Sequence, residues 1–214
     1  MMTEPTQHSL MPDEALMQAV ARGDALAFAE LFRRHRGQVY RFVLHMSAVP
    51  SLAEDVTQDV FLQVMQDAAR FDAERGSVGP WLFGFARNLL RRRFERETKL
   101  QPLMDDDSSG EIEAIATRED TLGDLTRAER IETLRRAILT LPLRYREPVV
   151  LCDLHEISYV DAAAAIGCAV GTVRSRLHRG RALLAAKMSA LEEIPASTGS
   201  EARPDGRGGA KCFA

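Results

Sequence analysis

The chain has 214 residues, 45% of them hydrophobic, and 28 basic side chains nearly balance 31 acidic ones, for a net charge of −3. This length allows one large or two small packed domains, while the lack of a long apolar run and the polar N-terminus exclude a membrane span and a signal peptide and predict a cytoplasmic protein. Because many free-standing DNA-binding proteins are basic, the weak net charge indicates that any DNA binding is assisted by another partner.

The first segment, residues 1–12, is polar and is expected to be disordered. A short helix is predicted to start at Asp13 and to end at Gly23, where glycine followed by aspartate breaks the pattern. A long helix is predicted over residues 25–46, because its apolar residues recur with a helical period. These apolar residues are Phe28, Leu31, Phe32, Val39, Phe42, Val43 and Met46.

Pro50 marks a break, and the next helix is predicted over residues 53–69. Its expected buried stripe is Val56, Val60, Phe61, Val64 and Met65. The start of this helix is acidic and carries amide groups, with Asp55, Gln58 and Asp59 as candidates for docking a basic partner surface. The alternative is that these acids only stabilise the helix through its dipole.

A loop with two glycines and a proline is predicted over residues 71–80, before an amphipathic helix that starts at Trp81. That helix is densely basic, and an aromatic residue beside arginines suits single-stranded DNA, because arginines follow phosphates and aromatic rings stack on bases. The candidate DNA-binding residues are Trp81, Arg87, Asn88, Arg91 and Arg92. In the alternative interpretation, Trp81 belongs to the core and the arginines are merely solvated.

Residues 99–127 are acidic and weakly periodic, which predicts a mobile linker. Residues 127–141 resume a helix that Pro142 ends, and a further helix is predicted over residues 143–154. The expected stripe of the first of these helices is Ile131, Leu134, Ile138 and Leu141. Residues 189–214 have the composition of a disordered tail to which no function is assigned.

Residues 157–184 are predicted to form two helices around a tight turn. Ser158, three residues before Asp161, fits a helix cap, and Gly167 suits the positive φ that ends a helix. The second helix has an apolar face and a basic face without acidic residues, as a helix-turn-helix presents to the DNA major groove, although an ordinary helical hairpin is the alternative. The apolar face consists of Val173, Leu177 and Leu184, and the candidate DNA contacts are Thr172, Arg174, Ser175, Arg176, His178 and Arg179.

Cys152, Cys168 and Cys212 form neither a disulfide framework nor a metal-binding pattern. The first two lie among apolar residues and are expected to fill the core in a reducing compartment, while the third would be an accessible thiol in the tail. A metal site that combines Cys152 and Cys168 with His155 and His178 is the alternative. We therefore expect no metal and no cofactor.

The pattern predicts an all-α protein with two small helical domains, residues 13–98 and 128–188, joined by a flexible acidic linker. Together these segments resemble bacterial RNA polymerase sigma factors of the extracytoplasmic-function (ECF) type. The resemblance covers residues 25–97 and 130–187. Five segments carry it in family-like order: FAELFRRHRGQVYRF, AEDVTQDVFLQVM, GSVGPWLFGFARNLL, LPLRYREPVVL and GCAVGTVRSRLHRGRALL.

The resemblance implies a role for each candidate surface. Asp55, Gln58 and Asp59 match the segment that docks on core RNA polymerase, and residues 71–80 with the helix carrying Trp81 and Asn88 match the element that melts and reads the −10 promoter element. The residues that match positions facing the −35 element are Arg174, Ser175, His178 and Arg179, whereas Arg176 and Arg181 would hold phosphates or packing. An anti-sigma factor is a further partner that the resemblance implies.

This sequence departs from the family pattern at three positions. The family often has an acid where Arg92 stands, which makes the −10 helix unusually basic here. Ala169 replaces a Ser or Pro at the turn, so the cap of the second helix is expected to be weaker. His178 occupies a variable position, which leaves the −35 preference open.

The sequence therefore predicts a promoter-specificity subunit without catalysis of its own, which binds core RNA polymerase and promoter DNA. A stand-alone helix-turn-helix repressor or activator is the alternative, and it leaves the basic helix after Trp81 without a role. An enzyme is not supported, because no carboxylate pair, phosphate loop or nucleophile motif stands out. Two separate arginine clusters argue against a helical adaptor that does not bind DNA.

Overall fold

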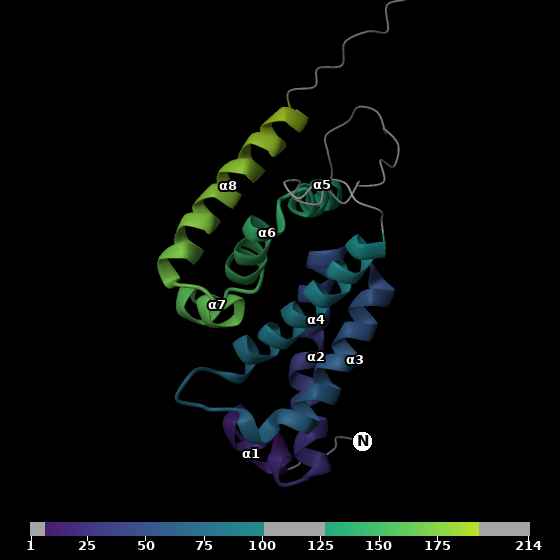
Figure 1. Ribbon diagram of the computed structural model, residues 1–214, viewed down its shortest axis with the longest axis vertical. Helices are drawn as coiled ribbons and strands as arrows, with labels where there is room; N and C mark the ends of the chain where they lie inside the picture. Colours follow the sequence, from purple (N-terminus) through teal and green to yellow (C-terminus); the bar gives the residue numbers. More distant parts are fainter. Residues whose placement is uncertain (1–6, 101–126, 193–214) are drawn as a thin grey trace, which may run out of the picture.

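The computed structural model describes residues 7–100 and 127–192, and within these ranges the chain is helical without β-strands. Helices α1–α4 form an N-terminal domain, and α5–α8 form a C-terminal domain that packs beside it (Figure 1). The predicted all-α class with two helical domains is confirmed. The predicted linker and tail fall mostly outside the described residues.

The N-terminal domain consists of α1 (Asp13–Ala21), α2 (Ala25–Ser47), α3 (Pro50–Asp67), the short 3-10 helix η2 (Ala68–Arg70) and α4 (Val78–Leu100). Its core is aliphatic and aromatic, and includes Leu16, Leu31, Val39, Phe42, Val60 and Leu82. Asp24 caps α2, because its carboxylate accepts hydrogen bonds from the backbone N–H groups of Leu26 and Ala27 at 2.9 and 3.1 Å. Most of the apolar residues predicted for α2 and α3, such as Leu31, Val39 and Val60, are buried, so the amphipathic patterns identified the surfaces that meet in this domain.

Three sequence predictions in this domain are wrong. Pro50 begins α3 instead of preceding it, and α4 starts at Val78, so that Pro80 lies inside its first turn. Proline is tolerated there because the first N–H groups of a helix have no intrahelical acceptor. Met65, expected in the buried stripe, is 56% exposed, since it points away from the side of α3 on which Val60 and Val64 are buried.

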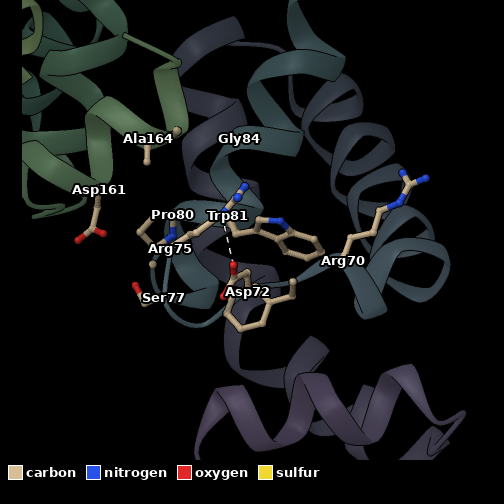
Figure 2. A pocket seen from close by; sticks show the side chains of 12 residues that line it. Arg70, Asp72, Arg75, Ser77, Pro80, Trp81, Gly84, Asp161 and Ala164 are labelled. Atoms are coloured by element: carbon tan, nitrogen blue, oxygen red, sulfur yellow. Dashed lines mark ion pairs between the residues drawn. The ribbon is translucent and has the colours of Figure 1, made fainter. Parts of the chain in front are cut away.

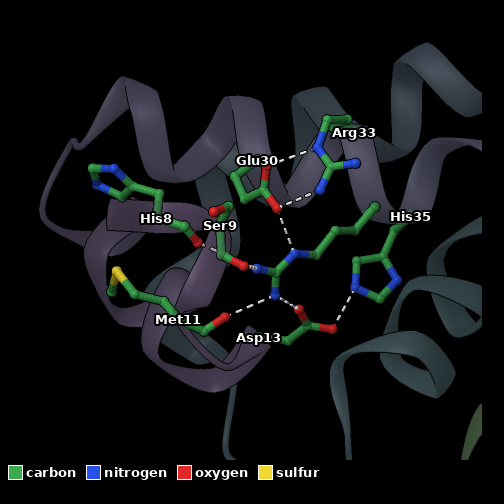
Figure 3. Close-up of polar contacts among 8 residues, drawn as sticks. His8, Ser9, Met11, Asp13, Glu30, Arg33 and His35 are labelled. Atoms are coloured by element: carbon green, nitrogen blue, oxygen red, sulfur yellow. Dashed lines mark hydrogen bonds and ion pairs between the residues drawn. The ribbon is translucent and has the colours of Figure 1, made fainter. Parts of the chain in front are cut away.

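Residues 7–12, expected to be disordered, are held against α2 by Arg34, whose partners His8, Ser9 and Met11 are labelled in Figure 3. The guanidinium of Arg34 donates hydrogen bonds to three backbone carbonyl oxygens, those of His8, Ser9 and Met11, at 2.8 to 3.2 Å. It also pairs with Asp13 and Glu30, each at 2.7 Å. Hydrogen bonds from Arg33 and Arg34 lower the pKa of Glu30 to about 2. One arginine thus orders a polar segment that has few apolar residues of its own.

The C-terminal domain consists of α5 (Arg127–Leu139), α6 (Leu143–Val149), the π-helical turn η3 (Val150–Leu154), α7 (Tyr159–Ile166) and α8 (Val170–Glu192). The single helix predicted over residues 143–154 is thus divided. Pro148 lacks an N–H group and its ring crowds the carbonyl four residues earlier, which disturbs the regular bonding pattern. The chain continues with wider bonds, such as the one from His155 N–H to the Val150 carbonyl at 3.1 Å.

The stripe predicted for α5 is only half buried. Ile138 and Leu141 are in the core, but Ile131 and Leu134 are 42% and 37% exposed. Helix α5 packs against α2 and α8, and its buried residues, Ala137 and Ile138, lie in the last turn, after the two exposed ones. The periodicity therefore identified the correct face but not how much of its length is covered.

The helix-turn-helix predicted over residues 157–184 is present as α7 and α8. Ser158 accepts a hydrogen bond from the backbone N–H of Asp161 at 3.1 Å, and Gly167 ends α7 with φ of 75°. The apolar face of α8 is buried, with Val173, Leu177 and Leu184 each at most 9% exposed. The opposite side of α8 therefore faces outward.

Gly180 lets α8 approach α6 closely. A Cβ atom at this position would lie 2.8 Å from Val149 Cγ2 and 3.2 Å from the carbonyl oxygen of Tyr145. We expect Gly180→Ala to lower the free energy of unfolding by about 1–3 kcal/mol, because overpacking outweighs the better helix propensity of alanine. Chemical unfolding followed by circular dichroism measures this change.

Gly171→Ala is the matched control in the same helix, because a Cβ atom there meets nothing within 4 Å. This control variant is expected to be neutral or slightly stabilised. Equal stability of the Gly180 and Gly171 variants would contradict the close packing.

Arg146 connects the two domains. Its guanidinium is buried and donates hydrogen bonds to the carbonyl oxygen of Met46 at 2.8 Å, across the domain boundary, and to that of Leu141 at 3.0 Å. It also donates to the carbonyl oxygen of Leu139. Burial lowers the pKa of Arg146 to about 10, which still leaves it charged at neutral pH.

An aromatic cluster fills the same boundary. The His155 ring lies 5.1 Å from the Phe83 ring and 6.0 Å from the Phe42 ring, measured between centroids, and 5.8 Å from the His45 ring. Burial lowers the pKa of His155 to about 4, so this ring is neutral at neutral pH. This part of the boundary therefore has the apolar character of a protein interior.

Candidate nucleic-acid interface

The outward side of α8 carries the residues predicted to contact the −35 element. Four of them, Arg174, Ser175, His178 and Arg179, are exposed, whereas Thr172 and Arg176 are half-buried. Val173 and Leu177 fix the opposite side of the helix in the core. The exposed side chains therefore form a row on a helix whose position is fixed by packing. This arrangement suits insertion of a helix into the major groove.

Two contacts organise the arginines around this row. The Arg174 guanidinium carbon lies 5.9 Å from the centre of the Tyr159 ring, a cation–π contact between α8 and α7. Arg181 forms two hydrogen bonds to Asp153, at 2.5 and 3.1 Å, and these bonds raise its pKa. Asp153 thus holds Arg181 in place on α8, while Arg174 remains solvent-accessible. The two roles predicted for Arg181, a phosphate contact or packing, stay predictions.

Trp81 lies beside a pocket at the start of α4. Its ring packs against the rings of Phe71 and Phe85, with centroids 5.6 and 4.4 Å away. The pocket has a volume of about 260 Å³ (Figure 2). On one side it is lined by Arg70 of η2 and by Asp72, Arg75, Gly76 and Ser77 of the loop before α4, and on the facing side by Asp161, Ala164 and Ala165 of α7. An aromatic wall with nearby cations can accept a planar, negatively charged ligand such as a nucleotide.

The predicted −10 residues do not all share one environment. Asn88, Arg91 and Arg92 are exposed on α4, and Arg91 forms an ion pair with Glu95 at 2.8 Å. Arg87 is different, because its Nε lies 2.7 Å from Glu147 Oε1 in the C-terminal domain and its side chain is only 15% exposed. Sequence reasoning missed Glu147, since nothing local marks a partner 60 residues away.

The acidic residues of α3 lie where they were predicted, at the surface. Asp55 and Gln58 are exposed and Asp59 is half-buried. Arg93 of α4 bridges the two carboxylates, with its guanidinium nitrogens 3.8 Å from Asp55 and 2.9 Å from Asp59. This cation holds the two carboxylates in place and partly neutralises them, a contact that the spacing within α3 alone could not reveal.

The described residues contain no group of three or more His, Cys, Asp or Glu side chains that could hold a metal ion. Cys152 is half-buried, and burial raises its pKa to about 11, which keeps the thiol protonated. Among the described helices, none is long and apolar enough to cross a membrane.

Comparison with known proteins assigns both domains. The sigma-70 region 2 family model matches residues 31–100, and the sigma-70 region 4 model matches residues 131–184. The ECF RNA polymerase sigma factor SigM of Mycobacterium tuberculosis (strain H37Rv) is 34% identical over 178 residues, which cover 81% of this chain and 83% of SigM. The chain belongs to the ECF sigma factor family.

Other relatives agree with this assignment. SigE of Mycolicibacterium smegmatis is 31% identical to this sigma factor, and the match covers 75% of this chain but only 62% of SigE. Among solved structures, CnrH in complex with the cytosolic domain of CnrY covers 83% of this chain with a TM-score of 0.62 and 26% identity. RpoE in complex with the anti-sigma factor NepR, from Bartonella quintana, covers 76% with a TM-score of 0.60 and 26% identity. Sigma factors as a family are not enzymes.

Proposed function

We propose that this sigma factor binds core RNA polymerase and directs initiation at promoters whose −35 element it reads with α8 and whose −10 element it reads with α4. The observation that carries this proposal is the exposed row of Arg174, Ser175, His178 and Arg179 on a helix whose other side is fixed in the core. Because the two DNA-binding domains are linked, binding of one domain raises the effective concentration of the other at its own promoter element, so the affinity of each domain alone can be weak. The protein itself then needs no catalytic group.

The pocket beside Trp81 supports strand capture at the −10 element. Extruding a base from the duplex costs on the order of a few kcal/mol, which stacking and polymerase contacts can offset. Asn88, Arg91 and Arg92 lie exposed further along α4, where they can contact the bases and phosphates of the melted strand. We assign the base to the Trp81 wall of the pocket, which α4 and the loop before it form, and the DNA backbone to these residues.

Run-off transcription tests the function directly. Purified core polymerase and this chain are incubated with genomic fragments, and the transcript start sites are mapped. The proposal predicts starts that share a −10 and a −35 sequence and that disappear when the chain is omitted. Specific DNA binding without polymerase, and no new transcripts with it, would favour the stand-alone helix-turn-helix regulator instead.

We assign core polymerase binding to the face of α3 that bears Asp55, Gln58 and Asp59. Reversing both charges with Asp55→Lys and Asp59→Lys is expected to weaken core binding by at least about tenfold, since like charges facing each other cost several kcal/mol. A pull-down with tagged core polymerase measures this loss.

The control for this charge reversal combines Glu132→Lys with Glu156→Lys, which changes the net charge equally at exposed positions of the other domain. Its core binding should be close to that of the parent chain. Loss of Arg93 pairing can destabilise the fold, so the melting temperature of both proteins is compared first. Undiminished binding of the folded Asp55 and Asp59 variant would rule out this docking face.

We also infer regulation by an anti-sigma factor, since the related RpoE is known in complex with the anti-sigma factor NepR. Promoter DNA and core polymerase are cytoplasmic, so this is the compartment in which we place the chain. Affinity purification of the tagged chain under non-inducing conditions would test the regulation, with one stoichiometric partner as the expected result. Recovery of the chain with core polymerase alone would argue against such a partner.

A further inference from the structure

Helix α7 of the C-terminal domain packs directly on α4, the helix assigned to the −10 element (Figure 1). The contact is close because small residues meet. A Cβ atom at Gly84 would lie only 3.8 Å from the carbonyl oxygen and 3.9 Å from the Cα atom of Ala165. The two backbones therefore leave no room for another molecule at this point.

The same helix forms one wall of the pocket beside Trp81. Figure 2 places Asp161 and Ala164 of α7 opposite Trp81, Pro80 and the loop. Asp161 Oδ1 lies 3.8 Å from the position of a Cβ atom at Gly76 in that loop. The Asp161 carboxylate repels a phosphate group, and α7 covers the side of the pocket that faces Trp81, so in this arrangement α7 restricts the access of a DNA strand to the pocket.

Arg87 is neutralised by the same interface. Its partner Glu147 is 4% exposed, and such a buried carboxylate requires a cation with good geometry. Arg91 and Arg92, which lie further along α4, stay exposed. The interface thus removes from solvent the one arginine of the predicted −10 set that lies under the C-terminal domain.

The rest of the interface between the two domains is also closely packed and hydrogen-bonded. Arg146 donates a hydrogen bond to the carbonyl oxygen of Met46 at 2.8 Å, and the His155 ring is inserted between α2 and α4 beside Phe42 and Phe83. Buried hydrogen bonds and aromatic contacts of this kind are characteristic of a fitted interface.

We propose that the C-terminal domain and the −10 strand compete for the same surface of α4, and that Arg87 exchanges Glu147 for a DNA phosphate when the domains separate. The free chain is thus closed, and promoter capture requires it to open. This inference rests on the −10 role proposed above for α4 and adds a competitor that the chain itself supplies.

A reversible lock tests the competition. Gly84→Cys and Ala165→Cys are introduced into a chain in which Cys152, Cys168 and Cys212 are replaced by serine. A Cβ atom at Gly84 would lie 3.9 Å from the Cα atom of Ala165, so the two backbones approach closely enough for a disulfide to be tried here. The chain is oxidised alone, freed of oxidant and then added to core polymerase and a promoter mapped with the parent protein. The same preparation after reduction is its control.

The oxidised chain is expected to give at least about tenfold less transcript than the reduced chain, and reduction should restore the yield. Equal transcript yields from both forms, or failure of the two cysteines to cross-link in the free chain, would overturn the proposal. The reduced chain separates this outcome from failure of the proposed function, because without that function even the reduced chain gives no transcript.

A pair of variants tests the exchange at Arg87. Glu147→Gln and Arg87→Gln both remove the ion pair, but only the second removes the proposed phosphate contact. Binding of a fluorescent randomised single-stranded DNA pool to the free chain should rise by roughly threefold or more for Glu147→Gln and fall by about fivefold for Arg87→Gln. Changes in the same direction for both variants would show that Arg87 has only a structural role.

Discussion

Replacing Arg174 or Arg179 with alanine is expected to lower transcription from −35-dependent promoters by about 10- to 100-fold. The estimate follows from the 1–3 kcal/mol that a good arginine–guanine pair contributes to base discrimination, at about 1.4 kcal/mol per factor of ten. Both side chains are exposed on α8, so their removal leaves the core of the helix-turn-helix unchanged. Run-off transcription on a mapped promoter, with and without its −35 element, measures the effect.

Arg181→Ala is the matched control for these two variants. It removes an arginine from the same helix, but one that Asp153 already holds through two hydrogen bonds. Its effect on transcription should be several-fold smaller, and none of the three variants should change core polymerase binding. Unchanged transcript yields for both Arg174→Ala and Arg179→Ala would refute the assignment of the −35 row.

Replacing Arg146 with methionine is expected to lower the free energy of unfolding by about 3 kcal/mol. Three carbonyl oxygens, those of Met46, Leu139 and Leu141, lose their common donor, and each unsatisfied buried group costs about 1–3 kcal/mol. Methionine keeps much of the side-chain volume and avoids the cost of burying a charge, which offsets part of the loss.

The melting temperature is expected to fall by about 6–12 °C, since 1 kcal/mol corresponds to about 2–4 °C in a protein of this size. The control is Arg144→Met, at an exposed position two residues earlier whose guanidinium lies 4.9 Å from the Tyr145 ring centre. This variant should melt within about 2 °C of the parent, as exposed substitutions usually do. A similar melting temperature for both variants would show that Arg146 contributes little.

The features that the sequence predicted well are those that a few residues close together in the sequence determine. The cap at Ser158, the turn at Gly167 and the apolar spacing of Val173 and Leu177 all act within two turns of a helix. Local propensity and tertiary packing agree there, so the helix-turn-helix could be located from the sequence alone. The resemblance to ECF sigma factors came from the same local segments.

The features that the sequence could not predict depend on contacts between distant segments. Arg87 was assigned to DNA, but its partner Glu147 lies in the other domain, and no spacing rule connects them. Residues 7–12 were expected to be disordered because their own composition is polar, and it is Arg34 of α2 that holds them. Met65 shows the same limit, since periodicity does not say how wide a buried stripe is.

The location of the competing surface on the same chain has a consequence for dosage. An inhibitor that is a separate protein is titrated when the sigma factor is made in excess, because sigma factor without bound inhibitor then accumulates. The domain that covers α4 is tethered to it, so its effective concentration is fixed by the chain and does not fall as more protein is made. Overproduction alone therefore does not raise the open fraction, and only a ligand that binds the open form more tightly, such as core polymerase, can do so.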